Sequence, residues 1–315
     1  MSQELASDLS NLQKQPKFVL WFSVYVYPHG ENDRFDVMMN SLRSYSRLPL
    51  DKAYINILLD QAYEGRRSEI DEVLKVFNCP VDYEPDRYTL RTQLVTRFDQ
   101  VREGLSDNDF IWLTQNDDHP YIDTSNDIVI EGLNTMAQDP HPYKSLYFSH
   151  WPEIIKLSIK QQEDQQVGNF IKWSGILCDS IQIFNVGYVS RILRELIPDD
   201  TSVRGHRIDG AIEGYHIGDG KNGVRANIYV PLKELCVHID GYGHVGIPYH
   251  VYPILQLPFE NINFNFSREE LIARMTVPCG GWTHHHTGGK IPSMAADAPI
   301  PQHYIDTMLK NYNKL

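Results

Sequence analysis

The sequence predicts an α/β fold in which helices cover both faces of a central, mostly parallel sheet. Three observations lead to this prediction. Apolar runs and amphipathic stretches alternate along the N-terminal part, short links join them, and the longest run, Phe18 to Tyr27, is almost continuously apolar. Such a strand is typical of a sheet that is buried on both faces. Short links between alternating strands and helices favour parallel strands with right-handed crossovers.

The residue pattern defines the first strands and helices. Apolar runs predict strands at 18–27, 54–59, 81–83 and 110–113, and apolar residues at helical spacing predict helices at 35–48, 66–77 and 90–105. Ligands bind beyond the carboxyl ends of the strands in such sheets. Asp60 ends the second strand and Asn116–His119 follows the fourth, so we expect these residues to face the same crevice.

The second half of the chain is less regular. We expect helices at 128–137, 186–196 and 209–215, strands at 145–149, 172–184, 227–230 and 235–239, and a polar helix or loop at 153–166. Two stretches match G-x-G-x-x-G, at 218–223 and 241–246. Neither lies between a strand and a helix, as a dinucleotide fingerprint must, so both predict turns.

The composition argues against several classes of protein. A formal charge of −12 disfavours nucleic acid as a partner, because phosphate neutralisation needs clustered Lys and Arg. No apolar run approaches the length of a membrane span, and no signal peptide is evident. The four cysteines are far apart and form no C-x-x-C pair, which indicates reduced thiols and a cytoplasmic setting.

A cluster of possible metal ligands follows the apolar run Phe110–Leu113. It contains Asn116, Asp117, Asp118 and His119. Mg²⁺ and Mn²⁺ prefer oxygen ligands and often share them with phosphates, so a buried strand that delivers carboxylates to a sheet edge suits these cations. The alternative is a strand followed by a turn rich in Asn and Asp.

The order of these features resembles the nucleotide-sugar glycosyltransferases of the GT-A fold. In that family a short acidic motif, Asp-x-Asp, holds Mn²⁺ or Mg²⁺ against the donor diphosphate at a strand end. Here Asn116-Asp117-Asp118-His119 takes its place, with Asn116-x-Asp118 replacing the usual pattern. Asp117, Asp118 and His119 therefore remain alternative main metal ligands.

The resemblance implies further roles on the donor side. Asp60 matches the acidic residue that often contacts the base or ribose, and Arg97 resembles a basic residue that precedes the motif strand. Asn116 and Asp117 would also contact the donor. His238 resembles a late histidine that completes the metal shell in some members. Its alternative is a histidine of the core.

The resemblance also implies the acceptor side and the organisation of the chain. In inverting members a carboxylate deprotonates the acceptor hydroxyl. Asp209, at a predicted helix start, is the first candidate and Glu213 the second, while the alternative for Asp209 is a helix cap. The expected organisation is a lead-in at 1–16, a GT-A-like Rossmann-type domain at 17–250 with donor and acceptor halves at 17–123 and 124–250, and an extension at 251–315 that packs on this domain.

The function expected from the resemblance is transfer of a sugar from a nucleoside-diphosphate sugar to a glycan or other hydroxyl acceptor. Two alternatives remain. One is a sugar- or nucleotide-binding module of the same fold without catalysis. The other is a non-haem iron oxygenase, since His238, Asp240 and His284 mimic an H-x-D…H facial triad. The loop His284–His286 closes over the site, forms an exposed turn, or binds a transition metal.

Overall fold

The computed structural model describes residues 15–28, 34–85, 91–114, 119–121, 123, 125–148, 165–175, 182–196, 226–233, 235–236, 239–240 and 247–248. Its first half alternates strands and helices as the sequence predicts. The elements are β1 (Phe18–Val26), α2 (Arg34–Tyr45), β2 (Lys52–Leu59), the 3₁₀ helix η1 (Gln61–Arg66), α3 (Arg67–Leu74), β3 (Val81–Glu84), α4 (Arg91–Val101) and β4 (Phe110–Thr114).

The second half adds shorter elements. They are α5 (Asp127–Gln138), β5 (Lys144–Tyr147), β6 (Gln165–Val167), β7 (Phe170–Gly175), β8 (Gln182–Asn185), α7 (Val186–Arg191), η2 (Ile192–Leu196), β9 (Ala226–Pro231), β10 (Ile239–Asp240) and β11 (Ile247–Pro248). The predicted helix at 186–196 is thus α7 continued by η2, which is a π-helical turn. In the part of the chain that the structure describes, the two short strands β10 and β11 pair with each other in a separate ladder.

The other strands form one nine-stranded sheet in the order β3-β2-β1-β4-β8-β5-β9-β7-β6. The first four strands in this order are parallel. Strand β8 is antiparallel to both of its neighbours, so β5 again runs in the direction of β4. Strand β9 is parallel to β5, and β7 and β6 complete the sheet in antiparallel pairs. The predicted parallel half is therefore confirmed, and the sheet as a whole is mixed.

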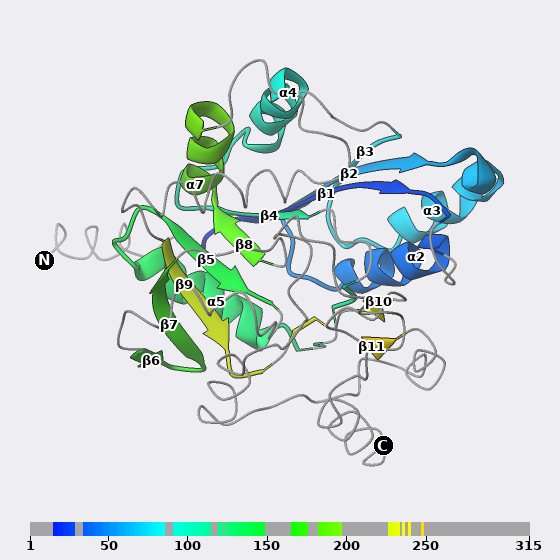
Figure 1. The fold of residues 1–315 in the computed structure, drawn as a ribbon. Coiled ribbons are helices and arrows are strands. Elements are labelled where there is room, and N and C mark those ends of the chain that lie inside the picture. Colours follow the sequence, from blue (N-terminus) through cyan, green and yellow to red (C-terminus); the bar gives the residue numbers. More distant parts are fainter. Residues whose placement is uncertain are drawn as a thin grey trace, which may run out of the picture.

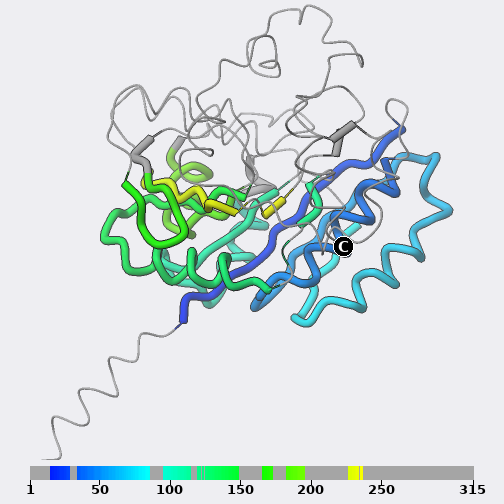
Figure 2. The backbone as a smooth tube through the Cα atoms, turned by 90° about the horizontal axis from the view of Figure 1, so that it is seen from below, coloured from blue at the N-terminus to red at the C-terminus, as the bar shows by residue number. Residues whose placement is uncertain are grey.

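Helices cover both faces of this sheet (Figure 1). Leu20 and Phe22 of β1 pack in one buried cluster with residues of α2 and α5. The intervening Val19 and Trp21 pack in a second cluster with residues of α4 and α7. Figure 2 views the molecule from the side of α2, α3 and α5, with β1 running diagonally across it. Because β1 is buried on both faces, its sequence has almost no polar alternation.

The strand predicted at 172–184 is wrong, and the helix or loop predicted at 153–166 is wrong at its last two residues. The stretch 172–184 is not one strand, because β7 pairs with β9 whereas β8 lies between β4 and β5. Of the polar stretch 153–166, residues 165 and 166 belong to β6, and the rest lies outside the described residues. Gly168, with φ of 57°, and Asn169 form the two-residue turn between the paired residues Val167 and Phe170. A Gly-Asn turn of this kind is typical of a β-hairpin.

The predicted strand at 235–239 is also not continuous. Leu235 lies outside any strand, and Cys236 forms an isolated antiparallel bridge with Tyr121. The backbone N–H groups of Leu235 and Cys236 both donate to the carbonyl of Phe148, each at 3.0 Å. Successive N–H groups of a strand point in opposite directions, so two donors to one carbonyl indicate a turn instead.

A buried carboxylate joins α5 to the C-terminal strands. Asp139 follows α5 directly, and its Oδ2 accepts hydrogen bonds from the hydroxyl of Tyr229 at 2.6 Å and from the amide of Asn227 at 2.7 Å. The ammonium of Lys172 on β7 lies 3.0 Å from the same oxygen. Asp139 Oδ1 accepts from the backbone N–H of His141 at 2.9 Å. Both oxygens of this buried carboxylate are thus satisfied.

Candidate functional site

The carboxyl ends of β1 and β4 mark the place where the sheet reverses its direction of growth. From β1 the chain adds β2 and β3 on one side, and it then returns to place β4 on the other side of β1. Open α/β sheets bind their ligands in the crevice outside such a reversal. Phe22 of β1 is in register with Thr114, the last residue of β4. Strand β4 therefore brings the chain to this crevice just before the acidic segment of the sequence begins.

Asp60 lies at the carboxyl end of β2, as the sequence predicts. Its Oδ1 accepts a hydrogen bond from the N–H of Ala62 at 3.0 Å and thereby caps η1. Its Oδ2 accepts from the hydroxyl of Tyr25 at 3.2 Å, and its own N–H donates to the carbonyl of Val26 at 2.8 Å. The half-buried carboxylate is therefore held in a fixed orientation beside the end of β1.

Two tyrosines at the end of β1 extend this group. The rings of Tyr25 and Tyr27 stack with centroids 5.2 Å apart and an angle of 29° between their planes. Tyr27 is 36% exposed. An aromatic face beside a carboxylate suits a planar ligand that stacks and donates an N–H group. The sequence analysis missed this pair, although aromatic residues at i and i+2 at a strand end share one face of the sheet.

The acidic segment is described only at His119, because Asn116, Asp117 and Asp118 lie outside the described residues. His119 is buried, with 2% of its surface exposed. Its carbonyl accepts a hydrogen bond from the hydroxyl of Tyr45, on α2, at 2.9 Å. Among the residues that the structure describes, no three His, Cys, Asp or Glu side chains are grouped closely enough to hold a metal ion. The roles predicted for the acidic segment stay predictions.

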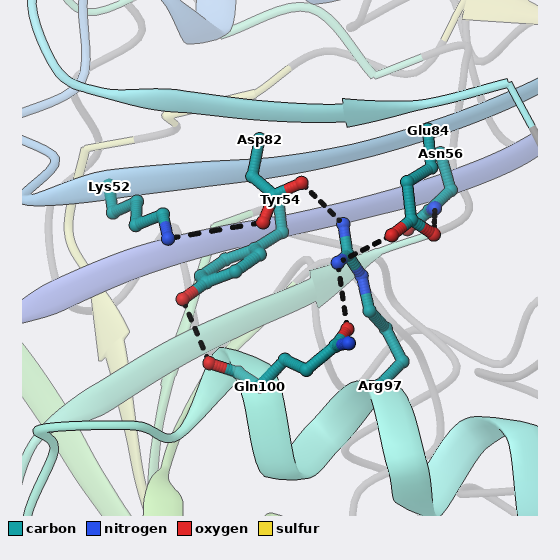
Figure 3. A network of polar contacts seen from close by, with 7 residues as sticks. All are labelled: Lys52, Tyr54, Asn56, Asp82, Glu84, Arg97 and Gln100. Atoms are coloured by element: carbon teal, nitrogen blue, oxygen red, sulfur yellow. Dashed lines mark hydrogen bonds and ion pairs between the residues drawn. The ribbon is translucent and has the colours of Figure 1, made fainter.

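Arg97 is buried between α4 and the edge of the sheet (Figure 3). Its Nη1 donates to Glu84 Oε1 at 3.1 Å and to Gln100 Oε1 at 2.9 Å, and its Nη2 donates to Asp82 Oδ1 at 3.3 Å. The guanidinium also lies 5.1 Å from the ring centroid of Tyr54. Since Asp82 and Glu84 are on β3, Arg97 fastens α4 to the edge strand. Its predicted contact with the nucleotide stays a prediction.

The remaining predicted residues fall outside the described part of the chain. This holds for Asp209, Glu213, His238 and His284. For Asp240 the structure gives only the backbone, which pairs with Pro248 in the short ladder of β10 and β11.

A second group of residues lies beyond the carboxyl ends of β4, β5 and β9: Tyr121, Asp123, Phe148, Lys233 and Cys236. Lys233 Nζ donates to Asp123 Oδ1 at 2.5 Å, and their side chains are 22% and 1% exposed. Burial, together with the nearby carboxylate of Asp123, raises the pKa of Tyr121. The sequence analysis missed the ion pair because its partners are 110 residues apart and no local pattern links them.

No protein-family model matches the sequence, and no curated protein matches it either. Among solved structures, Staphylococcus aureus TarS 1–349 in complex with UDP is 11% identical over 68% of this chain, with a TM-score of 0.39. The chain spans 60% of that structure. A further TarS 1–349 structure is 10% identical over 94% of this chain and 89% of its own, with a TM-score of 0.38.

An enzyme from Anaerococcus prevotii, 4-diphosphocytidyl-2C-methyl-D-erythritol synthase, is also similar. It is 10% identical over 68% of this chain and 89% of its own, with a TM-score of 0.37. None of the helices in the described part of the chain combines the length and apolar character needed to cross a membrane.

Proposed function

We propose that this chain is a glycosyltransferase that moves a sugar from a nucleoside-diphosphate sugar to a hydroxyl acceptor, with Mn²⁺ or Mg²⁺. The observation that supports it most is the position of β4. This strand ends in the crevice beside β1, and the segment Asn116–His119 follows it directly in the sequence. A ligand in this crevice would meet both Asp60 and the acidic segment.

The donor's base is proposed to lie at the ends of β1 and β2. The exposed ring of Tyr27 offers a stacking surface, and Asp60 offers a carboxylate that Tyr25 already orients. Arg97 would act indirectly, because its bonds to Glu84 and Asp82 hold α4 against β3, the neighbour of β2 in the sheet. We therefore assign Arg97 a positioning role in addition to its predicted contact with the donor.

Asn116, Asp117, Asp118, His119 and His238 are the residues proposed to hold the donor and the cation. Amide and carboxylate oxygens are the ligands that Mg²⁺ and Mn²⁺ prefer, so this donor set fits the group. When bound, the cation would stabilise the negative charge that develops on the leaving diphosphate. His119 is buried, and the hydrogen bond from Tyr45 to its carbonyl ties its part of the segment to α2.

Asp209 is proposed as the general base, with Glu213 as second candidate. As the bond between the sugar and the diphosphate breaks, the acceptor oxygen bonds to the sugar carbon from the opposite side. The acceptor hydroxyl then gives its proton to the carboxylate of Asp209. This course inverts the configuration at the sugar carbon.

The iron oxygenase is the weaker alternative. A facial triad of His238, Asp240 and His284 is usual in a β-sandwich, whereas the described strands form a mixed sheet with helices on both faces. A binding module without catalysis would have the same fold, so only a measurement of activity distinguishes it from the transferase.

A panel of nucleoside-diphosphate sugars tests the proposal. We expect at least one donor to be hydrolysed or transferred with Mn²⁺ present, and EDTA to stop the reaction. Binding without turnover of any donor would favour the non-catalytic module. Iron-dependent consumption of 2-oxoglutarate would instead favour the oxygenase.

A further inference from the structure

We propose that Lys233 binds a phosphate oxygen of the donor diphosphate, and that Asp123 holds its ammonium in place for this contact. The inference rests on the proposed function, because it assigns one more residue to the same edge of the sheet. Lys233 lies two residues after the end of β9, and β9 runs parallel to β5. Its side chain therefore belongs to the carboxyl edge, where the exits of β4 and β5 also lie.

The backbone around Lys233 is fixed on both sides. The N–H of Leu232 donates to the carbonyl of Asn169 at 2.8 Å, in the turn between β6 and β7. The N–H of Cys236 donates to the carbonyl of Phe148 at 3.0 Å, and Cys236 bridges to Tyr121. A lysine between two such anchors needs little further ordering to bind a ligand.

Within the described residues, the ammonium of Lys233 is held by one acceptor, so N–H donors remain for a ligand. It lies 2.5 Å from Asp123 Oδ1, and that carboxylate is nearly inaccessible, with 1% of its side chain exposed. Removal of the lysine would leave a buried, unpaired charge, so the pair is held together strongly. An ammonium carries three N–H donors. The described residues accept one hydrogen bond from Lys233, and its side chain is 22% exposed.

The positive charge of Lys233 would offset negative charge at the proposed diphosphate site. The chain carries a formal charge of −12, and in the sequence Asp117 and Asp118 come within four residues of the end of β4. A diphosphate that approaches this edge needs positive charge besides the cation. The buried Arg97 is already bound by Asp82 and Glu84, whereas Lys233 faces solvent in part.

Asp123 suits the role of holding Lys233 because, among the described residues, only one of its two carboxylate oxygens has a hydrogen-bond partner. Its Oδ2 is buried and has no hydrogen-bond partner among the described residues, and Ser125 adds only long contacts of 3.4 Å to Oδ1. The carboxylate thus depends on Lys233 for its charge compensation. The bond from Lys233 to Asp123 also orients the remaining N–H groups of the ammonium.

Binding of UDP, inorganic pyrophosphate and uridine, measured calorimetrically with Mn²⁺ present, tests the inference. Lys233→Met should weaken UDP and pyrophosphate by about tenfold or more, since a hydrogen bond to a charged group is lost. Uridine binding should not change, because uridine has no phosphate. Lys233→Arg should retain most of the affinity for both anions.

Lys172→Met is the matched control. Lys172 also pairs with a buried aspartate, at 3.0 Å, with side-chain exposures of 26% and 3%, but it lies on β7 beside Asp139. Lys172→Met should leave the affinities for UDP and pyrophosphate unchanged. Because Lys233→Met leaves Asp123 unpaired, the double variant Asp123→Asn/Lys233→Met removes both charges and keeps the test valid if the single variant does not fold.

The outcomes separate this inference from the proposed function. Wild-type affinity for UDP and pyrophosphate in Lys233→Met would overturn the role of Lys233, even if the enzyme has full transferase activity. If Lys233→Met loses anion binding but the wild type turns over no nucleotide sugar, the anion site stands and the transferase proposal fails. A wild-type protein that binds neither anion would overturn both.

Discussion

Asp139 and Asp123 are both buried aspartates, and each is paired with a partly exposed lysine. Around Asp139, donors from β7, β9 and the backbone occupy both carboxylate oxygens. Around Asp123, one oxygen is bound by Lys233 and the other has no partner among the described residues. The first aspartate lies directly after α5, at the start of the segment that leads into β5, and the second lies beyond the end of β4.

The difference separates a structural site from a candidate binding site. A carboxylate whose acceptors are all used has little capacity left for a ligand, and its loss is felt in stability. Buried polar atoms without partners are costly, and a carboxylate oxygen in this position can still accept a hydrogen bond. We therefore expect changes near Asp139 to lower stability with little effect on catalysis, and changes at the carboxyl edge to do the reverse.

The largest effect on turnover is expected at the proposed base. Asp209→Asn keeps the shape and polarity of the side chain but cannot accept the proton of the acceptor. Transfer should fall by about 10²–10⁴-fold, the usual contribution of a general base. Steady-state kinetics would measure this loss, and calorimetry should show unchanged donor affinity. Near-normal turnover, or a product that retains the donor's configuration, would remove Asp209 from this role.

The largest effect on stability is expected at Asp139. Asp139→Ala leaves Lys172, Asn227 and Tyr229 without their common acceptor, and breaking a buried ion pair in this way costs about 3 kcal/mol or more. Urea unfolding would measure the loss, while the specific activity of the folded variant should stay close to that of the wild type. An Asp139→Ala variant with wild-type stability but impaired turnover would contradict the structural role assigned to Asp139.

The pH dependence of stability is a second test of the structural role of Asp139. Burial of Asp139 alone would raise its pKa, but hydrogen bonds from Tyr229, His141, Asn227 and Lys172 outweigh this effect and lower it to about 2. The stabilisation is therefore complete above the unfolded-state pKa of 3.8 and is lost as the pH falls through about 2. It amounts to roughly 2 kcal/mol. The gap in unfolding free energy between the wild type and Asp139→Asn should narrow over this range, and a constant gap would contradict the assignment.

The smallest effect is expected at Tyr25. Tyr25→Phe removes the hydroxyl that donates to Asp60 at 3.2 Å but keeps the ring that stacks on Tyr27. The loss of one ordinary hydrogen bond is worth about 1 kcal/mol, so UDP affinity should fall by a few-fold. A titration of UDP measures the change. If thermal stability drops instead and affinity is unchanged, the pair is structural.

The parallel half of the fold was predictable because its signals are local. The run Phe18 to Val24 is buried on both faces, and each helix of this half carries one apolar stripe. The hairpin turn Gly168-Asn169 also has a local signal, which the sequence analysis missed. The boundary between β7 and β8 has no such signal, because a short apolar run does not reveal its neighbours in the sheet.

The candidate site was predictable only where it follows directly from a strand end. Asp60 satisfies this condition, since β2 ends at the residue before it. The contacts of Arg97 with Asp82 and Glu84 depend on how α4 packs against β3, which helical periodicity does not specify. Asp123 and Lys233 meet only because β4 and β9 end at the same edge of the sheet.

Thermal unfolding of the wild type and of Asp118→Ala, with UDP in Mn²⁺ and in EDTA, tests the central claim most directly. A ligand that binds only the folded state raises its stability by an amount that grows with the logarithm of the ligand concentration divided by Kd. If the segment after β4 holds the cation against the diphosphate, UDP should stabilise the wild type strongly in Mn²⁺ and weakly in EDTA. Asp118→Ala should show the same small shift in both conditions. A full Mn²⁺-dependent shift in Asp118→Ala would contradict the account.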